Sequence, residues 1–295
     1  MTCTALEHAL AADKSDVCLD EEWAYWRPSE YVVFDSTPTS LHEMGLVVTS
    51  DGWTVGKAEP DTQYTDVPGR AGGVDTSVEH LMDLTGFGGA PYAKRRTIEI
   101  NVAALGDSLQ IHEAMLRLAK RSGTTVCVSG LLEDRALYFD GRMSLSEWTP
   151  VHAAGGALVA AKAKISINAD PYAYGPQRIV KLAEGENNIA VEGTAPTRPY
   201  VHLTRKTGST AAGVVTHYNT DTHMKPALAP DGNTLGWGFD CGAPSLNRQT
   251  DRDEDLTETP ISMDSRWLEL PGGPNRLDLT NTDGGWLGYR PAYRI

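Results

Sequence analysis

Apolar and polar residues alternate with a period of two along much of this sequence, and this alternation constrains the fold more than any other feature. It is clearest over residues 157–168, where apolar residues alternate with polar ones such as Lys162 and Lys164. Residues 96–102 alternate in the same way. A period of two is typical of β-strands with one buried and one solvated face. Since 29 glycines and 17 prolines supply frequent turns, we expect a mainly β protein with many short strands.

One helix is predicted within this β pattern. Asp107 is a suitable N-cap, and Gln110 three residues later can complete a capping box. Apolar residues then recur at helical spacing at Ile111, Ala114, Met115 and Leu118. Gly123 is expected to follow the C-terminal end of this helix.

Two short segments predict tight turns. Asp140-Gly141 lies between two apolar runs and favours a two-residue hairpin turn. Ser50-Asp51-Gly52 follows an apolar run and predicts a second turn. We therefore expect the chain to reverse direction at both places.

A segment with two prolines and a glycine, Asp170–Pro176, predicts a domain boundary. The expected organisation is an N-terminal arm (residues 1–30), an N-terminal β domain (31–175) and a C-terminal β-sandwich (176–295). Short candidate strands recur after the boundary about every 8 to 12 residues, which is typical of a sandwich. They include residues 259–263 and 267–270, whereas residues 248–258 are expected to form a charged loop.

The chain is acidic, with 26 Lys and Arg against 39 Asp and Glu and a formal net charge of −13. This charge disfavours sequence-specific binding to nucleic acid and binding to anionic membranes. The longest apolar stretch, residues 153–161, is too short to cross a bilayer, and no secretory signal is expected.

The four cysteines, Cys3, Cys18, Cys127 and Cys241, form no Cys-x-x-Cys pair. We expect four reduced thiols in a protein made in a cytoplasm. A bridge between Cys3 and Cys18 is the alternative.

No sequence motif predicts a catalytic, cofactor or metal site. The glycines of residues 69–73 lack the spacing and helix of a dinucleotide-binding loop. Asp251, Asp253 and Asp255 begin like a calcium loop, but Leu256 and Ser262 stand where its glycine and glutamate belong. His217 and His223 could face each other across a hairpin, at a spacing that matches no zinc site. We expect no enzyme activity, no cofactor and no metal.

Three tryptophans in the C-terminal half are candidate contacts for a glycan or a partner: Trp237, Trp267 and Trp286. Exposed aromatic rings can stack on a sugar or fill a pocket of a partner. Burial in the core of the sandwich is the alternative, since β domains regularly bury tryptophan.

Two groups of motifs occur in a defined order. Residues 63–75 read Gln-Tyr-Thr-Asp-Val-Pro-Gly-Arg-Ala-Gly-Gly-Val-Asp, followed by Tyr92 and by Arg-Arg-Thr-Ile-Glu-Ile at 95–100. In the C-terminal half, Pro199 stands before a predicted strand. Three further motifs follow: Leu-Gly-Trp-Gly-Phe-Asp-Cys at 235–241, Leu-Glu-Leu-Pro-Gly-Gly-Pro-Asn at 268–275 and Gly-Tyr-Arg-Pro-Ala-Tyr at 288–293. Together these motifs resemble the distal tail protein (Dit) family of long-tailed bacteriophages over residues 31–295. The arm, residues 78–90 and the extra residues of 270–275 depart from the family pattern.

The resemblance implies an N-terminal sandwich similar to tail-tube proteins, with one flanking helix, and a C-terminal galectin-like sandwich. It implies a homohexameric ring at the distal end of a virion tail. The ring would contact the tail tube protein, the tape measure protein, the tail-associated hub protein and receptor-binding or baseplate proteins. DNA would pass its central channel without specific binding, and no membrane would be bound.

Three hypotheses follow for the function. The first is this structural ring protein, with Pro68, Gly69, Arg70 and Gly72 at a contact with another subunit or the hub, because a glycine-rich turn with one arginine fits closely against a backbone. The second is a carbohydrate-binding lectin-like module of the tail tip. The third is a glycan hydrolase with carboxylates brought together from distant strands.

Overall fold

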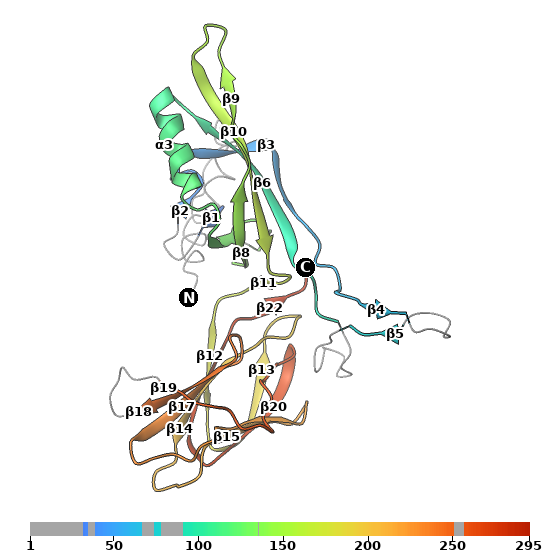
Figure 1. Ribbon diagram of the computed structural model, residues 1–295, viewed down its shortest axis with the longest axis vertical. Helices are drawn as coiled ribbons and strands as arrows, with labels where there is room; N and C mark the ends of the chain where they lie inside the picture. Colours follow the sequence, from blue (N-terminus) through green and yellow to red (C-terminus); the bar gives the residue numbers. More distant parts are fainter. Residues whose placement is uncertain (1–31, 35–38, 67–73, 78–90, 135, 251–256) are drawn as a thin grey trace. The chain divides into compact units, whose positions relative to one another are not determined.

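The computed structural model describes residues 32–34, 39–66, 74–77, 91–134, 136–250 and 257–295 (Figure 1). The chain divides into two compact units. Unit 1 comprises Met1–Pro60, Ala93–Pro176 and Arg294–Ile295, and unit 2 comprises Asp61–Tyr92 and Gln177–Tyr293. The expected arm, residues 1–30, lies outside the described residues.

Unit 1 is an antiparallel sheet with one helix. Its strands are β1 (Val33–Phe34), β2 (Thr39–Ser40), β3 (Leu46–Val55), β6 (Arg96–Leu105), β7 (Thr125–Ser129), β8 (Tyr138–Leu145), β9 (Thr149–His152), β10 (Leu158–Ala169) and β11 (Ala173–Tyr174). They pair in the order β2-β1-β7-β8-β10-β6-β3, with β9 also beside β10 and β11 beside β8.

The two alternating segments are strands, as predicted, and they form the neighbouring internal strands β6 and β10. β6 and β10 pair in register from Ala160↔Leu105 to Ala169↔Arg96. Their apolar residues, among them Ile100 and Ile165, are buried on one face, and Lys162 and Lys164 are exposed on the other. Burial of one face explains why the register holds over the full length of both strands.

The predicted helix is α3 (Ser108–Ala119), and it packs on β6 and β10. The Asp107 side chain accepts a bond from the Gln110 backbone N–H at 2.8 Å, and the Gln110 side chain accepts one from the Asp107 N–H at 3.0 Å. This is the expected capping box. Lys120 is the C-cap, and Gly123 has a left-handed φ of 82° three residues further on.

Both predicted turns in unit 1 are wrong. Asp140 and Gly141 lie inside the continuous strand β8, where Gly141 pairs with Ala169 of β10 and Val126 of β7. Ser50-Asp51-Gly52 lies inside β3, whose register to β6 shifts between Val48 and Trp53. A glycine inside a strand marks a close backbone approach in the first case and a bulge in the second.

Unit 2 is a β-sandwich with an additional short ladder. Its strands are β4 (Tyr64–Thr65), β5 (Val74–Asp75), β12 (Arg178–Leu182), β13 (Gly185–Val191), β14 (Tyr200–Arg205), β15 (Val214–His217), β16 (Thr222–Met224), β17 (Thr234–Asp240), β18 (Ser245–Thr250), β19 (Thr257–Glu258), β20 (Gly273–Thr280), β21 (Thr282–Tyr289) and β22 (Ala292–Tyr293). One sheet has the order β12-β21-β14-β17-β18-β19, the other has the order β13-β20-β15-β16, and β4 pairs with β5.

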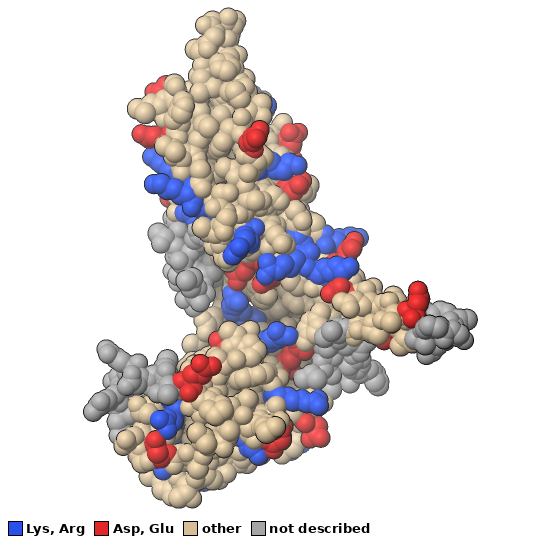
Figure 2. All heavy atoms as spheres, viewed as in Figure 1, with Lys and Arg blue, Asp and Glu red and all other residues tan. Residues whose placement is uncertain are grey.

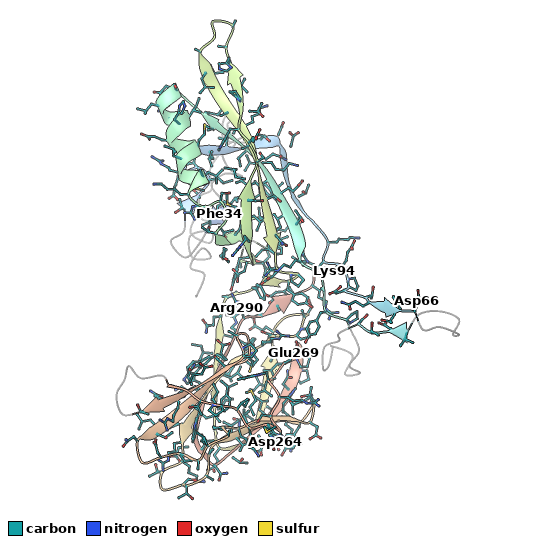
Figure 3. The ribbon with its side chains drawn as sticks, in the orientation of Figure 1. Phe34, Asp66, Lys94, Asp264, Glu269 and Arg290 are labelled. Atoms are coloured by element: carbon teal, nitrogen blue, oxygen red, sulfur yellow. The ribbon has the colours of Figure 1, made fainter. Side chains whose placement is uncertain are left out.

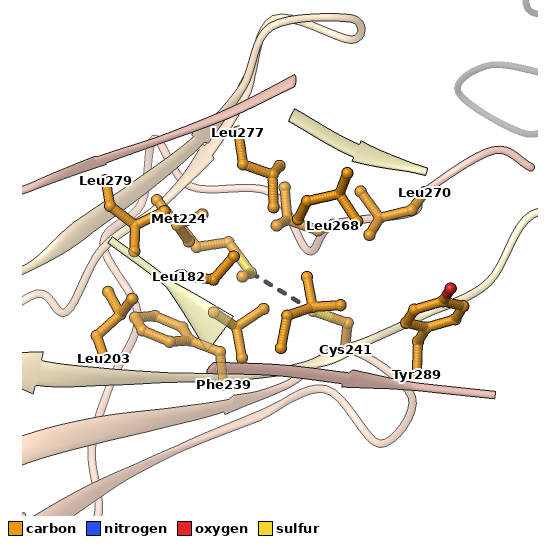
Figure 4. Close-up of a cluster of buried hydrophobic side chains, with 14 of the residues drawn as sticks. Leu182, Leu203, Met224, Phe239, Cys241, Leu268, Leu270, Leu277, Leu279 and Tyr289 are labelled. Atoms are coloured by element: carbon orange, nitrogen blue, oxygen red, sulfur yellow. Dashed lines mark hydrogen bonds between the residues drawn. The ribbon is translucent and has the colours of Figure 1, made fainter. Parts of the chain in front are cut away.

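The core of the sandwich lies between these two sheets (Figure 4). Leu203 and Phe239 come from the six-stranded sheet, and Leu277 and Leu279 come from the four-stranded sheet. Cys241 is free and buried in this core, with its Sγ 3.6 Å from the Sδ of Met224. Burial raises the pKa of the Cys241 thiol to about 12, so this cysteine is an apolar core residue rather than a reactive thiol.

Two predictions for unit 2 and one for the cysteines are wrong. Residues 259–263 and 267–270 form no strand beyond isolated bridges at Ile261 and Leu270. The expected charged loop begins within β18, because residues 245–250 pair with β17. Cys127 is disulfide-bonded, which contradicts the expectation of four reduced thiols, and its partner lies outside the described residues.

Candidate functional site

The predicted contact turn, formed by Pro68, Gly69, Arg70 and Gly72, lies outside the described residues. The strands on either side of it are described: Tyr64 pairs with Asp75, and Thr65 pairs with Val74. The Ser77 hydroxyl and backbone N–H both donate to the Asp75 carboxylate, and these bonds lower the pKa of Asp75. Tyr64 is 67% exposed, so this ladder presents an aromatic ring to its surroundings.

Polar contacts attach the segment that carries this ladder to the sandwich of unit 2. The Arg198 guanidinium donates to the Tyr92 hydroxyl at 3.1 Å and lies 5.6 Å from the centre of the Tyr92 ring. It also forms an ion pair of 3.6 Å with Glu269, whose side chain is only 7% exposed. Figure 3 labels Glu269 in the sandwich and Asp66 beside β4. A buried carboxylate that is paired in this way fixes the geometry of its partner.

The three candidate tryptophans have different surroundings. Trp237 is 1% exposed in the sandwich core, so the prediction of a ligand contact is wrong for this residue and its alternative, burial, is right. Trp267 is half-buried and packs against the same core. Trp286 is half-buried and lies on the outer face of the six-stranded sheet, opposite Lys181 and His202.

Trp286 belongs to an aromatic cluster that the sequence analysis missed. Its ring stacks on Tyr200, with centroids 5.2 Å apart and planes at 24°, and on His202, with centroids 5.7 Å apart and planes at 12°. Tyr200 and His202 are two residues apart on β14, so both side chains point to the outer face. The sequence signal for this cluster is the pair of aromatic residues at positions 200 and 202. That pair places two rings on one face of a strand, but only the register of β14 against β21 shows that Trp286 lies beside them.

The two histidines of the predicted hairpin do not face each other. In the β15–β16 ladder Thr216 pairs with His223 and His217 pairs with Thr222, so the two imidazoles point to opposite faces. His223 Nε2 lies 3.3 Å from the Asp264 carboxylate. Bonds from Ser262, Lys225 and His223 hold the pKa of Asp264 well below its usual range.

His217 is fully buried and held as a neutral imidazole. Its Nε2 donates to Asn275 Oδ1 at 3.0 Å, and its Nδ1 accepts from the Thr220 hydroxyl at 2.8 Å. The Asn275 amide in turn donates to the carbonyls of Pro271 and Gly273, which fixes the direction of its oxygen. Burial lowers the pKa of His217 below its usual value.

This lowered pKa predicts a pH-dependent stability of unit 2. The unfolded chain takes up a proton at His217 near its ordinary pKa of about 6.5, whereas the folded unit resists protonation. The free energy of unfolding should therefore fall as the pH drops below about 6.5, until the folded pKa is reached. Urea midpoints between pH 8 and pH 5 measure this slope. His217→Gln should reduce the slope, and an identical slope in this variant would contradict the prediction.

Within the described residues, no three His, Cys, Asp or Glu side chains are grouped so that they could hold a metal ion. The calcium-loop resemblance at Asp251, Asp253 and Asp255 falls outside that part of the chain. None of the helices among the residues described is long and apolar enough to cross a membrane.

The fold, a helix-flanked β unit together with a β-sandwich, is similar to that of a solved distal tail (Dit) protein of a phage. One solved structure that it matches is the SPP1 Dit (gp 19.1) protein, described as a paradigm of the hub adsorption apparatus in phages that infect Gram-positive bacteria. The TM-score is 0.57 at 15% sequence identity, over 88% of this chain and 98% of the SPP1 chain. The predicted resemblance is thereby confirmed for the fold.

Two structures of the phage P2 baseplate in its activated conformation, with Ca and with Sr, also match, each with a TM-score of 0.46. Their identities are 11% and 12%, and both matches cover 88% of this chain and 98% and 97% of the other. No family model matches the chain. No curated protein matches its sequence.

Proposed function

We propose that this chain is a structural distal tail protein of a phage virion, which forms a homohexameric ring between the tail tube and the tail-tip hub. The observation that carries this proposal is the fold shared with SPP1 Dit over nearly the whole of both chains. In the proposed role the ring contacts the tail tube, tape measure and hub proteins, and DNA passes through its centre. The role requires no catalytic step, so the protein is proposed to be structural and not an enzyme.

Open sheet edges in unit 1 support contacts between subunits. Among the described residues, the ten-residue strand β3 pairs with β6 on one side only and stands at the end of the strand order. Such an edge offers backbone N–H and C=O groups to a strand of another chain. The long strand β10 has strand partners along both sides and offers no such edge. β3 is therefore the better candidate for this contact.

The hairpin formed by β9 and the start of β10 supports a second contact. Residues 149–159 contain no Lys, Arg, Asp or Glu, and Val151 and Val159 are exposed by 36% and 41%. Figure 2 shows this hairpin without a blue or red side chain. An exposed segment of this length without charge is a feature of surfaces that pack against another protein.

The mass of the purified full-length protein tests the proposal. A homohexamer has six times the chain mass of 31.9 kDa, and light scattering together with negative-stain microscopy should show that mass as a ring with a central hole. The measurement should be repeated with the tail tube and hub proteins of the same phage, because rings can close only during assembly. A monomer that joins no ring even with these partners would overturn the proposal.

The predicted turn contact is tested in the same assay. Arg70→Glu reverses the charge at the proposed contact, so it should weaken ring closure or hub binding while the isolated chain keeps its thermal unfolding midpoint. Arg142→Glu, an exposed charge reversal on the internal strand β8 of unit 1, is the matched control and should assemble normally. Unchanged assembly of Arg70→Glu would remove residues 68–72 from the proposed contact.

A further inference from the structure

We propose that the outer face of the six-stranded sheet in unit 2 binds the ring of a neutral saccharide. The site is the aromatic cluster, defined as Tyr200, His202 and Trp286, together with the polar residues beside it. This inference goes beyond the proposed ring function, because it concerns a ligand of the sandwich and depends on no contact between subunits.

Glycines of the same sheet make room for the three rings. A Cβ at Gly238 would collide with the Tyr200 hydroxyl, one at Gly236 would lie 3.4 Å from His202 Nε2, and one at Gly288 would lie 3.2 Å from the Trp286 ring. Each ring therefore occupies the space above a glycine of its own or the neighbouring strand. The result is an aromatic surface of three rings that is built into the sheet and fixed by stacking.

Polar side chains stand beside this surface. His202 Nε2 donates to Gln249 Oε1 at 2.9 Å, and Asn247 pairs with Gly238 next to the cluster. Asp240 pairs with Tyr200 across the sheet. Burial, followed by the negative charge of Asp240, raises the pKa of the Tyr200 hydroxyl. Amide groups donate to and accept from hydroxyl groups, carboxylates accept from them, and aromatic rings match the C–H faces of a pyranose.

The cluster also contains an unsatisfied polar atom. His202 Nδ1 is buried and has no hydrogen-bond partner among the described residues. Nε2 is already bonded to Gln249, so Nδ1 is the ring nitrogen that lacks a partner. A buried polar atom without a partner costs free energy, which a hydroxyl group of a ligand would recover.

The charges of the site favour a neutral ligand. Asp240 lies beside Tyr200 and repels phosphate and other anions, which disfavours nucleotides and phosphate polymers. Lys181, opposite Trp286, supplies a single cation at the other side of the cluster. A surface of stacked rings with amide groups at its border is the pattern by which proteins hold uncharged hydroxyl-rich rings.

Saturation-transfer NMR on the full-length protein tests this inference. The probes are lactose, cellobiose and N,N′-diacetylchitobiose, with glycerol 3-phosphate as an anionic comparison. We expect transfer to the pyranose C–H protons of at least one disaccharide and none to glycerol 3-phosphate. Absence of transfer to all three disaccharides, or transfer to glycerol 3-phosphate alone, would overturn the proposal.

Variants locate the binding. Trp286→Ala should weaken binding about tenfold, because it removes the central ring of the stack. Tyr218→Ala is the matched control, since Tyr218 is a 50% exposed aromatic residue of the same unit, beside Arg276, and follows a strand of the other sheet. If Trp286→Ala does not fold, Asn247→Ala provides the test and should weaken binding severalfold. Equal binding by the wild type and a folded site variant contradicts the inference, and ring mass is unaffected either way.

Discussion

Gly141→Ala should destabilise unit 1 by about 3 kcal/mol or more, although it adds a single methyl group. A Cβ at this position would lie 2.6 Å from the Ala169 Cα and 2.8 Å from the Asn168 carbonyl oxygen. Both atoms belong to the backbone of β10, so a change of side-chain rotamer cannot relieve these two contacts. The strands β8 and β10 would have to separate at the centre of the sheet.

Urea unfolding of unit 1, followed by amide exchange of β8 and β10, measures this loss. Gly155→Ala is the matched control, because nothing lies within 4 Å of a Cβ at that exposed hairpin position. If Asp140-Gly141 were the hairpin turn that its sequence suggests, alanine would cost only about 1 kcal/mol. Equal midpoints for the two variants would therefore contradict the observed pairing.

Trp237→Ala should remove about 4 kcal/mol of stability from unit 2, the largest loss expected from truncating any one side chain of that sandwich. Trp237 is the largest fully buried side chain among the described residues. It lies in register with Leu203, and a Cβ on Gly213 would sit only 3.3 Å from its ring. A loss of this size is a large fraction of the net stability of a typical domain, which is about 5–15 kcal/mol.

Trp267→Ala is the matched control, because it shows how much stability is lost when a tryptophan outside the centre of the core is truncated. Trp267 packs against the same core but is partly exposed, so its truncation should cost about 2 kcal/mol. Denaturant midpoints and near-ultraviolet circular dichroism of both variants make the comparison. If Trp267→Ala is as damaging as Trp237→Ala, the assignment of Trp237 to the centre of the core is wrong.

Regular features of the fold could be predicted from sequence because local chemistry determines them. The alternation around Ile100 and Ile165 predicted two strands, each with one buried face, since a period of two is typical of such strands. Asp107 and Gln110 predicted the start of α3, because both partners of a capping box lie within one turn. The family resemblance rested on the order of several turn and strand motifs, and the fold that it implied is confirmed.

Other features could not be predicted because they depend on register across strands. In the sequence, Gly141 resembles a turn residue. Only its pairing with Ala169 shows that β10 passes too close for any side chain at this position. The aromatic cluster is another example: Tyr200 and Trp286 are far apart in sequence and meet through the β14–β21 register. Neither position has a neighbour in sequence that would reveal this contact.

The strand order of unit 2 has a consequence for its synthesis. β21 lies between β12 and β14, and β20 lies between β13 and β15, so each sheet is completed by a strand made after residue 272. While the ribosome is still translating the preceding hundred or so residues, both sheets lack an internal strand and expose unpaired edges. Folding of the sandwich must therefore await nearly its whole length, and such non-local pairing is slow. Where many copies are translated at once, the unpaired edges of neighbouring nascent chains are free to pair with one another.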